Sequence, residues 1–599
     1  MAALFAVVLA VRLMAFKGGL PITTEASLLR RMLLPLGLFV VWSAISITYA
    51  ASAGWVIHET LTWGLYLTFL SLFWLLLQEG SGLTTVYKGF LITACILGLN
   101  SIIDVLSITN FADSEGTIRI RYGKFAELLA TILPLIAAIA LYAKRKQVIV
   151  ISAGWLLGWS ALMLSLSKGA FLAGSLAHIV FFAGSSLFAR PGFRGRALKL
   201  AGVWLVFTVI FQASFSIWSQ VPSTTDYITG AAEKTRGTSI FRTFAWRVGL
   251  EMISQHPVVG VGAGNFGIAF NDARAARAER NPKDRTPEIA EDYIVERAHN
   301  EPLQILAELG IIGGLLSGLG LCIFLSAVIR KFLQSRFQLS PVLWSALAGM
   351  LGFGISSMVS SFSFRAIQNG IAFFLIATIA VYQIDRRRPG RATERAGRFR
   401  IAVAFGGLAF GLLMTAFTGS KALGEYYASK AEAEGDSIAA SEIYRSSIAV
   451  DRDNASVYYY LSARQADAGR HNEAAASLRE GIDRGLGVSI TYSLLAEYQL
   501  LAGDADESER TLREAIHIFP NSVFLRVRLG IFLMDVRHDP ASAAEFEYAS
   551  SIDPRQAKGW QMIMTDGSVA AYYAAKTDET IAPPVDLWPA NAALHYLDK

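Results

Sequence analysis

The sequence predicts an all-α protein in two parts: a polytopic membrane bundle of about twelve transmembrane helices, and a C-terminal region of short repeated helices. Hydrophobic residues make up 53% of the 599 residues and charged residues only 17%. The mean hydropathy is +0.41, which is typical of a multi-pass membrane protein and excludes an ordinary soluble one. Long apolar runs continue to about residue 420, after which the chain becomes charged and alanine-rich. We therefore predict a membrane domain at residues 1–420 and a second domain at residues 421–599.

Twelve apolar segments are long enough, or nearly so, to cross the membrane as helices, since a span of the hydrocarbon core needs about 20 residues. The first contains Arg12 but lacks the basic leader and the cleavage site of a signal peptide, so we keep it as a membrane segment. The twelve segments lie at residues 1–16, 32–52, 58–77, 87–106, 124–143, 147–166, 169–187, 199–217, 302–328, 341–361, 366–384 and 401–419.

The basic residues between these segments predict their orientation. Clusters of lysine and arginine follow segments 1, 5, 7, 9 and 11, and basic loops stay in the cytoplasm. The opposite, external side then holds both termini, a loop at 107–123, a long loop from about 218 to 301, and everything after residue 420. Attraction to anionic lipid is an alternative reason for the basic clusters and is compatible with the same orientation.

Residues 435–560 contain an internal repeat. Isoleucines and leucines recur there with a period of 34 residues: Ile448, Ile482 and Ile516, and likewise Leu461, Leu495 and Leu529. An alanine-rich helical pattern with this period resembles tetratricopeptide (TPR) repeats, although Ser462 stands where a glycine is usual. Such repeats would form an α-solenoid with a concave surface for a protein partner. A spacer without any ligand is the alternative.

Three motifs are interpreted as structural. The run at 262–267 satisfies the dinucleotide-binding pattern G-x-G-x-x-G, but no βαβ unit surrounds it, so its glycines favour a tight turn or a close backbone approach. The Asp-Arg-Asp run at 451–453 resembles the metal-binding acidic pair of many glycosyltransferases. Because it lies in a repeat turn, we interpret it as solvated surface. Three arginines at a spacing of three, Arg274, Arg277 and Arg280, are interpreted as one solvated helix face.

The cysteine and acidic patterns indicate neither a metal site nor a cofactor. Cys95 and Cys322 both fall within apolar runs, so the sequence has no disulfide framework and no zinc-site spacing. Asp104 lies near the end of a membrane segment, where we interpret it as a structural residue that faces water. We expect no metal, no cofactor and no nucleic-acid partner.

Polar residues gather on the predicted external side. His299 stands where the long loop runs into an apolar helix, and Asn300 and Pro302 are suited to begin that helix. Basic side chains on this side suit a diphosphate-bearing lipid, because guanidinium groups pair bidentately with phosphate. They are Arg119 and Arg121 in the 107–123 loop, Lys168, Arg242, Arg247 and Arg365. The alternatives are ion pairs with the acids of the long loop for the arginines, and an interfacial structural role for the histidine.

The long loop resembles that of a known family. The motifs are Arg242-Thr243-Phe244-Ala245-Trp246, the run from His256 to Phe266, and Ala298-His299-Asn300 followed by Leu303-Gln304 and Glu308-Leu309-Gly310. In their order and spacing they resemble the periplasmic loop of the O-antigen ligase and polymerase superfamily. Weaker similarities are the run at 165–170, where the family more often has an arginine than Lys168, and the turn that ends at Arg365. The resemblance covers most of residues 85–385, and ligases usually place one more helix before this loop.

The resemblance implies a membrane glycosyltransferase of the bacterial inner (cytoplasmic) membrane, with its C-terminal domain in the periplasm. Members take a glycan from undecaprenyl pyrophosphate and attach it to an acceptor, such as a glycan or a lipid A-core, without metal. By that resemblance His299 is the catalytic histidine, and Arg242 with one or both of Arg119 and Arg121 holds the diphosphate. Lys168, Arg247 and Arg365 would add positive charge to the donor site.

The chemistry of these residue types fits an inverting transfer. A sugar joined to a hydroxyl needs a neutralised leaving group, which arginines supply, and a base near neutral pKa, which histidine supplies. Three functions stay open: a polysaccharide polymerase or O-antigen ligase, an O-linked protein oligosaccharyltransferase, and a non-catalytic polysaccharide transporter or flippase. We favour the polymerase over the ligase, because an appended external repeat domain suits a complex that elongates and exports a chain.

Overall fold

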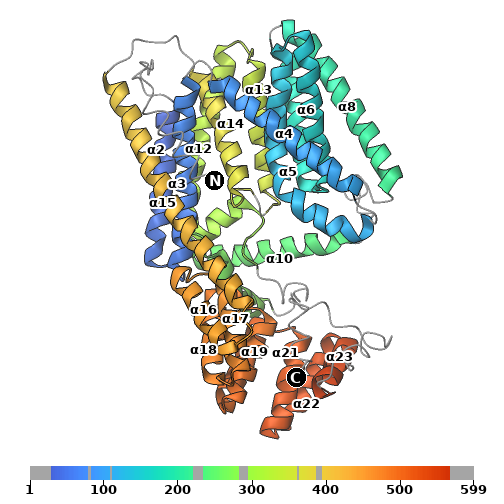
Figure 1. Cartoon of the computed structure of the whole chain (residues 1–599), viewed down its shortest axis with the longest axis vertical. Coiled ribbons are helices and arrows are strands. Elements are labelled where there is room, and N and C mark those ends of the chain that lie inside the picture. Colours follow the sequence, from blue (N-terminus) through green and yellow to red (C-terminus); the bar gives the residue numbers. More distant parts are fainter. Residues whose placement is uncertain are drawn as a thin grey trace. The chain divides into compact units, whose positions relative to one another are not determined.

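The computed structural model describes residues 28–78, 82–107, 111–189, 191–219, 234–281, 295–360, 363–385 and 394–566. All regular elements among these residues are helices (Figure 1). Contacts divide the chain into two compact units. The first comprises Met1–Ile45, His58–Thr238 and His299–Ala416, and the second comprises Ser46–Ile57, Ser239–Ala298 and Phe417–Lys599.

The apolar helices lie mainly in the first unit. Among the described residues, nine helices are long and apolar enough to cross a membrane, and α13, with 17 residues, is shorter. The protein is therefore a multi-pass membrane protein. In chain order these ten helices are α2 (Leu28–Ile45), α3 (Ala53–Gln78), α4 (Gly82–Ser107), α5 (Phe111–Tyr142), α6 (Arg145–Leu164), α7 (Lys168–Leu187), α8 (Pro191–Ser219), α12 (Glu301–Gln334), α13 (Pro341–Ser357) and α14 (Ile367–Asp385). Helix α15 (Glu394–Glu432) follows them.

The predicted segments correspond to these helices with three exceptions. The segment at 341–361 forms a helix that ends earlier, at Ser357. The segment at 401–419 lies inside the 39-residue helix α15, and the segment at 1–16 lies outside the described residues. The count of twelve spans stays a prediction.

Two predicted loops contain helices. The loop predicted at 107–123 is wrong, because α5 begins at Phe111 and carries Arg119 and Arg121 inside it. No proline interrupts the polar residues before the apolar part of α5, so the helix continues beyond the part that is apolar enough to span. The long loop at 218–301 contains α10 (Lys234–Gln255) and α11 (Phe266–Arg280).

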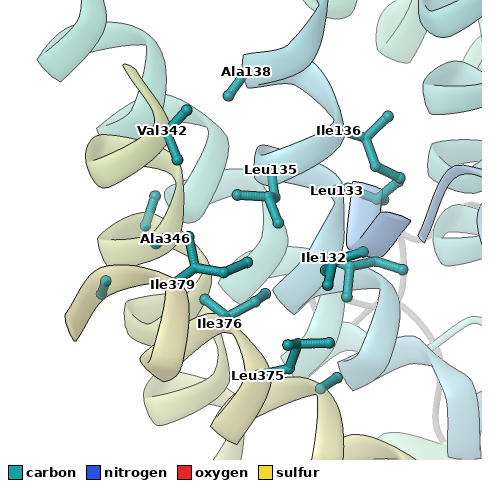
Figure 2. Packing of buried hydrophobic residues seen from close by; sticks show 14 of the residues in the cluster. Ile132, Leu133, Leu135, Ile136, Ala138, Val342, Ala346, Leu375, Ile376 and Ile379 are labelled. Carbon is teal, nitrogen blue, oxygen red and sulfur yellow. The ribbon is translucent and has the colours of Figure 1, made fainter. Parts of the chain in front are cut away.

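The core of the first unit is built around α5, which packs against α4, α6, α7, α13 and α14. Figure 2 shows Leu135 of α5 in one buried cluster with Ala346 of α13 and with Ile376 of α14. Gly349 lets α13 approach the backbone of α5, since a Cβ atom there would lie 2.3 Å from the carbonyl oxygen of Thr131. Small residues at such crossings are how apolar helices come close in a membrane.

The second unit combines part of the long loop with the C-terminal helices. Its 34-residue anchors Leu461, Leu495 and Leu529 are buried in alternate helices, with one further α-helix between each anchor and the next. The assignment to tetratricopeptide repeats stays a prediction. The C-terminal helices are α16 (Ser437–Val450), α17 (Ala455–Asp467), α18 (His471–Gly481), the π-helical turn η3 (Ile482–Leu486), α19 (Ser489–Leu501), α20 (Ala505–Ile518), α21 (Val523–Phe532), the π-helical turn η4 (Leu533–Arg537), α22 (Ser542–Ile552) and α23 (Pro554–Asp566).

Candidate functional site

His299 precedes the first turn of α12 in an unusual backbone conformation. Its φ is +56°, in the left-handed region that residues with a Cβ atom seldom adopt, and its side chain is half-buried. The next residue, Asn300, is extended and caps the helix: its side chain accepts a hydrogen bond from the amide of Leu303 at 3.0 Å. The cap expected from the sequence is therefore confirmed. Backbone strain of this kind is concentrated at functional sites.

A break in α12 separates this first stretch from the long membrane helix. Gly310 has φ +62° and ψ −165°, which is not helical and which only glycine adopts without strain. The indole Nε1 of Trp42, on α2, donates a hydrogen bond to the carbonyl of Leu309 at 3.0 Å. The bond joins α2 to the last residue before the break.

The stretch before the break has a buried polar face. Glu301, Gln304 and Glu308 are spaced so that they share one side of the helix, and each is less than a tenth exposed. The side-chain amide of Gln304 donates a hydrogen bond to Oε1 of Glu308. From the sequence we expected a structural role for Glu308, but not this buried face. The signal for this face was the placement of polar residues three and four positions apart in an otherwise apolar helix.

Lys168 and Arg365 lie in two turns that touch. Lys168 is half-buried and is the first residue of α7, and Arg365 is exposed in the turn between α13 and α14. A Cβ atom at Gly169 would lie 3.0 Å from the side chain of Val359, which follows α13. The structure thus brings the α6–α7 turn beside the turn that leads to Arg365.

Glu127 is a polar residue of this region that the sequence analysis missed. It lies on α5 and is 2% exposed. Its Oε1 accepts a hydrogen bond from the hydroxyl of Ser360. The side chain of Asn369 donates to the carbonyl of Lys124 at 3.2 Å. The signal was a carboxyl group inside an apolar segment, which is costly and is usually functional.

Arg242 and Arg247 lie on α10, in the second unit. Arg242 is half-buried and Arg247 is exposed. The apolar face of α10 between and beyond them is buried, with Phe244 at 6% exposure and Val248 at 0%. For Arg119 and Arg121, on α5, the structure describes the backbone position only.

The glycine-rich turn before α11 is explained by the chain segment it contacts. Gly262 has φ +99°, and a Cβ atom there would lie 2.4 Å from the Cβ atom of Ala50. The side chain of Asn265 accepts a hydrogen bond from the amide of Ser52 at 2.7 Å and donates to the carbonyl of Ala263 at 2.9 Å. The glycines therefore allow a tight turn and a close approach between two segments of the second unit.

Two sequence interpretations are wrong. Arg274 does not belong to a solvated face, because it is 4% exposed and packs against aromatic rings. In the Asp-Arg-Asp run, Arg452 is exposed but the two aspartates are not solvated surface. Asp451 is buried and accepts a hydrogen bond from Lys421 at 2.9 Å, and Asp453 accepts one from the hydroxyl of Ser52 at 3.1 Å. Arg274, Asp451 and Asp453 each contact residues far away in the sequence, and no local sequence pattern reveals such partners.

Acidic and histidine side chains do not cluster as metal ligands in the part of the chain that the structure describes: no group of three or more His, Cys, Asp or Glu residues has a suitable arrangement. The candidate site residues that are described are cationic and imidazole groups, and the acids Glu127, Glu301 and Glu308 are buried in the same unit as His299.

Comparison with known families finds a match over part of the chain. Residues 153–318 match the family model described as O-Antigen ligase. The matched range includes Lys168, Arg242, Arg247 and His299, and it ends inside α12 beyond Gly310. No curated protein matches the chain. In general terms, the match supports a membrane protein that transfers glycans as a ligase or polymerase.

Proposed function

We propose that this protein transfers a glycan from an undecaprenyl-pyrophosphate donor to a hydroxyl acceptor at the periplasmic face of the bacterial inner membrane. The observation that carries the proposal is His299. It lies inside the range that matches the O-Antigen ligase family, has a left-handed backbone, and directly precedes Asn300, which caps the apolar helix α12. A titratable imidazole at that boundary is suited to act on a lipid-linked substrate.

The proposed reaction is an inverting displacement at the anomeric carbon of the donor glycan. The acceptor oxygen forms the new bond to this carbon as the bond to the pyrophosphate oxygen breaks, and neutral His299 takes the acceptor proton. The electron pair leaves with undecaprenyl pyrophosphate, whose charge Arg242 and one or both of Arg119 and Arg121 stabilise. Lys168, Arg247 and Arg365 add positive charge for donor binding, and no metal is needed for any of these steps.

Two acceptors fit this chemistry, and each has support. The family description favours a ligase, which joins a finished glycan to lipid A-core. The charged C-terminal region favours a polymerase, which joins repeat units to a growing glycan in an export complex, with protein partners bound to the C-terminal helices. We place the polymerase first because a ligase needs no appended domain to recognise a small lipid acceptor.

A polysaccharide analysis of a deletion strain, complemented with the wild-type gene, tests this proposal. Loss of long chains with single units retained indicates a polymerase. Full-length lipid-linked chains that stay unattached indicate a ligase. Normal amounts and lengths of all surface glycans in the deletion strain would contradict both. If only the glycosylation of proteins were altered, the acceptor would be a protein.

A further inference from the structure

The C-terminal helices bind α11 of the long loop along much of its length. The side-chain amide of Asn271 donates a hydrogen bond to the carbonyl of Gly487 at 2.7 Å. Near the other end of α11, Nε2 of His517 lies 3.6 Å from a carboxylate oxygen of Glu279. Ile268 packs against Gly485: a Cβ atom at Gly485 would lie 3.5 Å from the side chain of Ile268. All of these residues belong to the second unit, so α11 is part of its packing.

Arg274 is the most buried of these contacts and joins three helices. Its guanidinium carbon lies 4.4 Å from the ring centroid of Phe519, which closes α20, and 5.4 Å from that of Phe244 on α10. Both rings are buried, at 1% and 6% exposure, and Arg274 itself is 4% exposed. The attraction between a cation and an aromatic face is strongest when water is excluded, as it is here.

Phe244 connects this cluster to the arginines that we assign to the donor. It lies on α10 two positions after Arg242 and three positions before Arg247. A rotation or shift of α10 about the buried Phe244 ring moves both arginines together, because the helix is a rigid element over so few residues. The position of these two cations therefore depends on the Arg274 contact.

A second, independent contact fixes the glycine-rich turn to the C-terminal helices. Asp453 accepts hydrogen bonds from the hydroxyl of Ser52 at 3.1 Å and from Arg484 at 3.4 Å. The backbone amide of Ser52 is bonded to the side chain of Asn265, which begins α11. The start of α11 is thus attached through Ser52 to the turn before α17, and from there to η3, while its middle is attached to Phe519 at the end of α20 through Arg274.

We propose that the C-terminal helices position the long loop for catalysis, and that Arg274 is a positioning residue that acts through Phe244 on Arg242 and Arg247. The inference rests on the proposed function for the role of these two arginines. It assigns the C-terminal region a role in donor binding, so that a partner which shifts α20 alters the affinity for the lipid-linked glycan. A spacer or a separately tethered module would have no such effect.

The test compares two stacked arginines of the same region in the full-length protein. Arg274→Ala removes the contact between α11, α10 and α20. Arg526→Ala is the matched control: Arg526 also lies over an aromatic ring, 4.3 Å from the centroid of Tyr548, and pairs with Glu545, but it contacts C-terminal helices only. Arg274→Lys keeps the charge and loses the planar group that stacks on the rings. Hydrogen exchange of α10 and the donor KM and kcat are measured for each variant.

The proposal expects faster exchange of the α10 amides in Arg274→Ala and a donor KM raised about tenfold or more, with a smaller change in kcat. Arg274→Lys gives an intermediate result, and Arg526→Ala matches the wild type in both measurements. Equal changes in Arg274→Ala and Arg526→Ala, or unchanged exchange of α10 in Arg274→Ala, would overturn it. Faster exchange with an unchanged donor KM would also overturn it.

The exchange measurement needs no substrate, so it separates this inference from the proposed function. If the wild-type protein transfers no glycan from a polyprenyl pyrophosphate, the proposed function fails. Faster α10 exchange in Arg274→Ala alone would then still show that the C-terminal helices hold the loop. Wild-type transfer with no exchange difference would instead retain the function and remove the coupling.

Discussion

Trp42 on α2 donates a hydrogen bond to the carbonyl of Leu309, 3.0 Å away, at the point where Gly310 breaks α12. The indole supplies this carbonyl with a donor inside the apolar bundle, where no water is present to do so. The bond therefore connects α2 to the short stretch that starts immediately after His299.

Gly310→Ala tests whether the break is required. A Cβ atom at φ +62° and ψ −165° is strained by about 1–3 kcal/mol, so we expect a lower thermal unfolding midpoint and a large loss of transfer. Gly318→Ala, on the same helix with open space around it, is the control and should retain both. Trp42→Phe keeps the ring and loses the donor, and should cost about 1 kcal/mol of stability. A fully active Gly310→Ala protein of normal stability would show that α12 functions as well when unbroken.

Glu127 and Ser360 test the connection between α5 and the turn that carries Arg365. Glu127→Gln retains an acceptor for the Ser360 hydroxyl and should be mild, whereas Glu127→Ala removes this acceptor and should cost about 1–3 kcal/mol. The effects of Glu127→Ala and Ser360→Ala should not add, because they remove one bond. The buried Ser345, which bonds only within α13, provides the control Ser345→Ala. Additive losses in the double variant would mean that the two residues act separately.

Reporter fusions test the predicted topology. Fusions after Gln220 and after Lys430 should be active only as exported reporters, since the basic clusters place residues 218–301 and 421–599 on the external side. A fusion after Lys144, in a basic loop, should give the cytoplasmic signal and serves as the control. A cytoplasmic signal from either external fusion would invalidate the count of twelve spans.

The isolated fragment 421–599 tests whether the C-terminal helices fold around their own core. Circular dichroism should show a strongly helical spectrum, because most of the buried anchors pack against neighbouring C-terminal helices.

Burial raises the pKa of the Tyr498 phenol above its ordinary value of 10.0. Stability is therefore retained below that pH and decreases above it, as the unfolded chain loses the proton first. Tyr498→Phe should reduce this loss of stability at alkaline pH. For the fragment itself, a disordered spectrum at neutral pH would contradict the prediction that the C-terminal helices form a self-contained stack.

The sequence predicted what depends on local patterns. The nine spans follow from runs of apolar residues, and the start of α12 follows from Asn300 and Pro302, whose side chains act on adjacent backbone. Glu127 was within reach of the same reasoning, since an acid in an apolar segment needs an explanation.

What the sequence did not predict depends on distant partners. The burial of Arg274 requires Phe519, which lies on a helix of the repeat region, and the role of Asp453 requires Ser52, more than half the chain away. The helical location of Arg119 and Arg121 was missed for a different reason. A polar stretch that continues an apolar helix has the same composition as a loop, and only the absence of proline distinguished it.

Single-turnover transfer by purified protein in lipid, with a defined polyprenyl-pyrophosphate glycan, tests the central claim about His299 most directly. His299→Ala, and His299→Asn, which tolerates the left-handed backbone, should insert normally and bind donor, yet transfer about 10²–10⁴-fold more slowly. His538→Ala removes another left-handed histidine, in the C-terminal region, and should match the wild type. Arg242→Ala should instead weaken donor binding, and Arg242→Lys should restore it only in part. Wild-type rates from correctly inserted His299→Asn and His299→Ala proteins would contradict the assignment of His299 as the base.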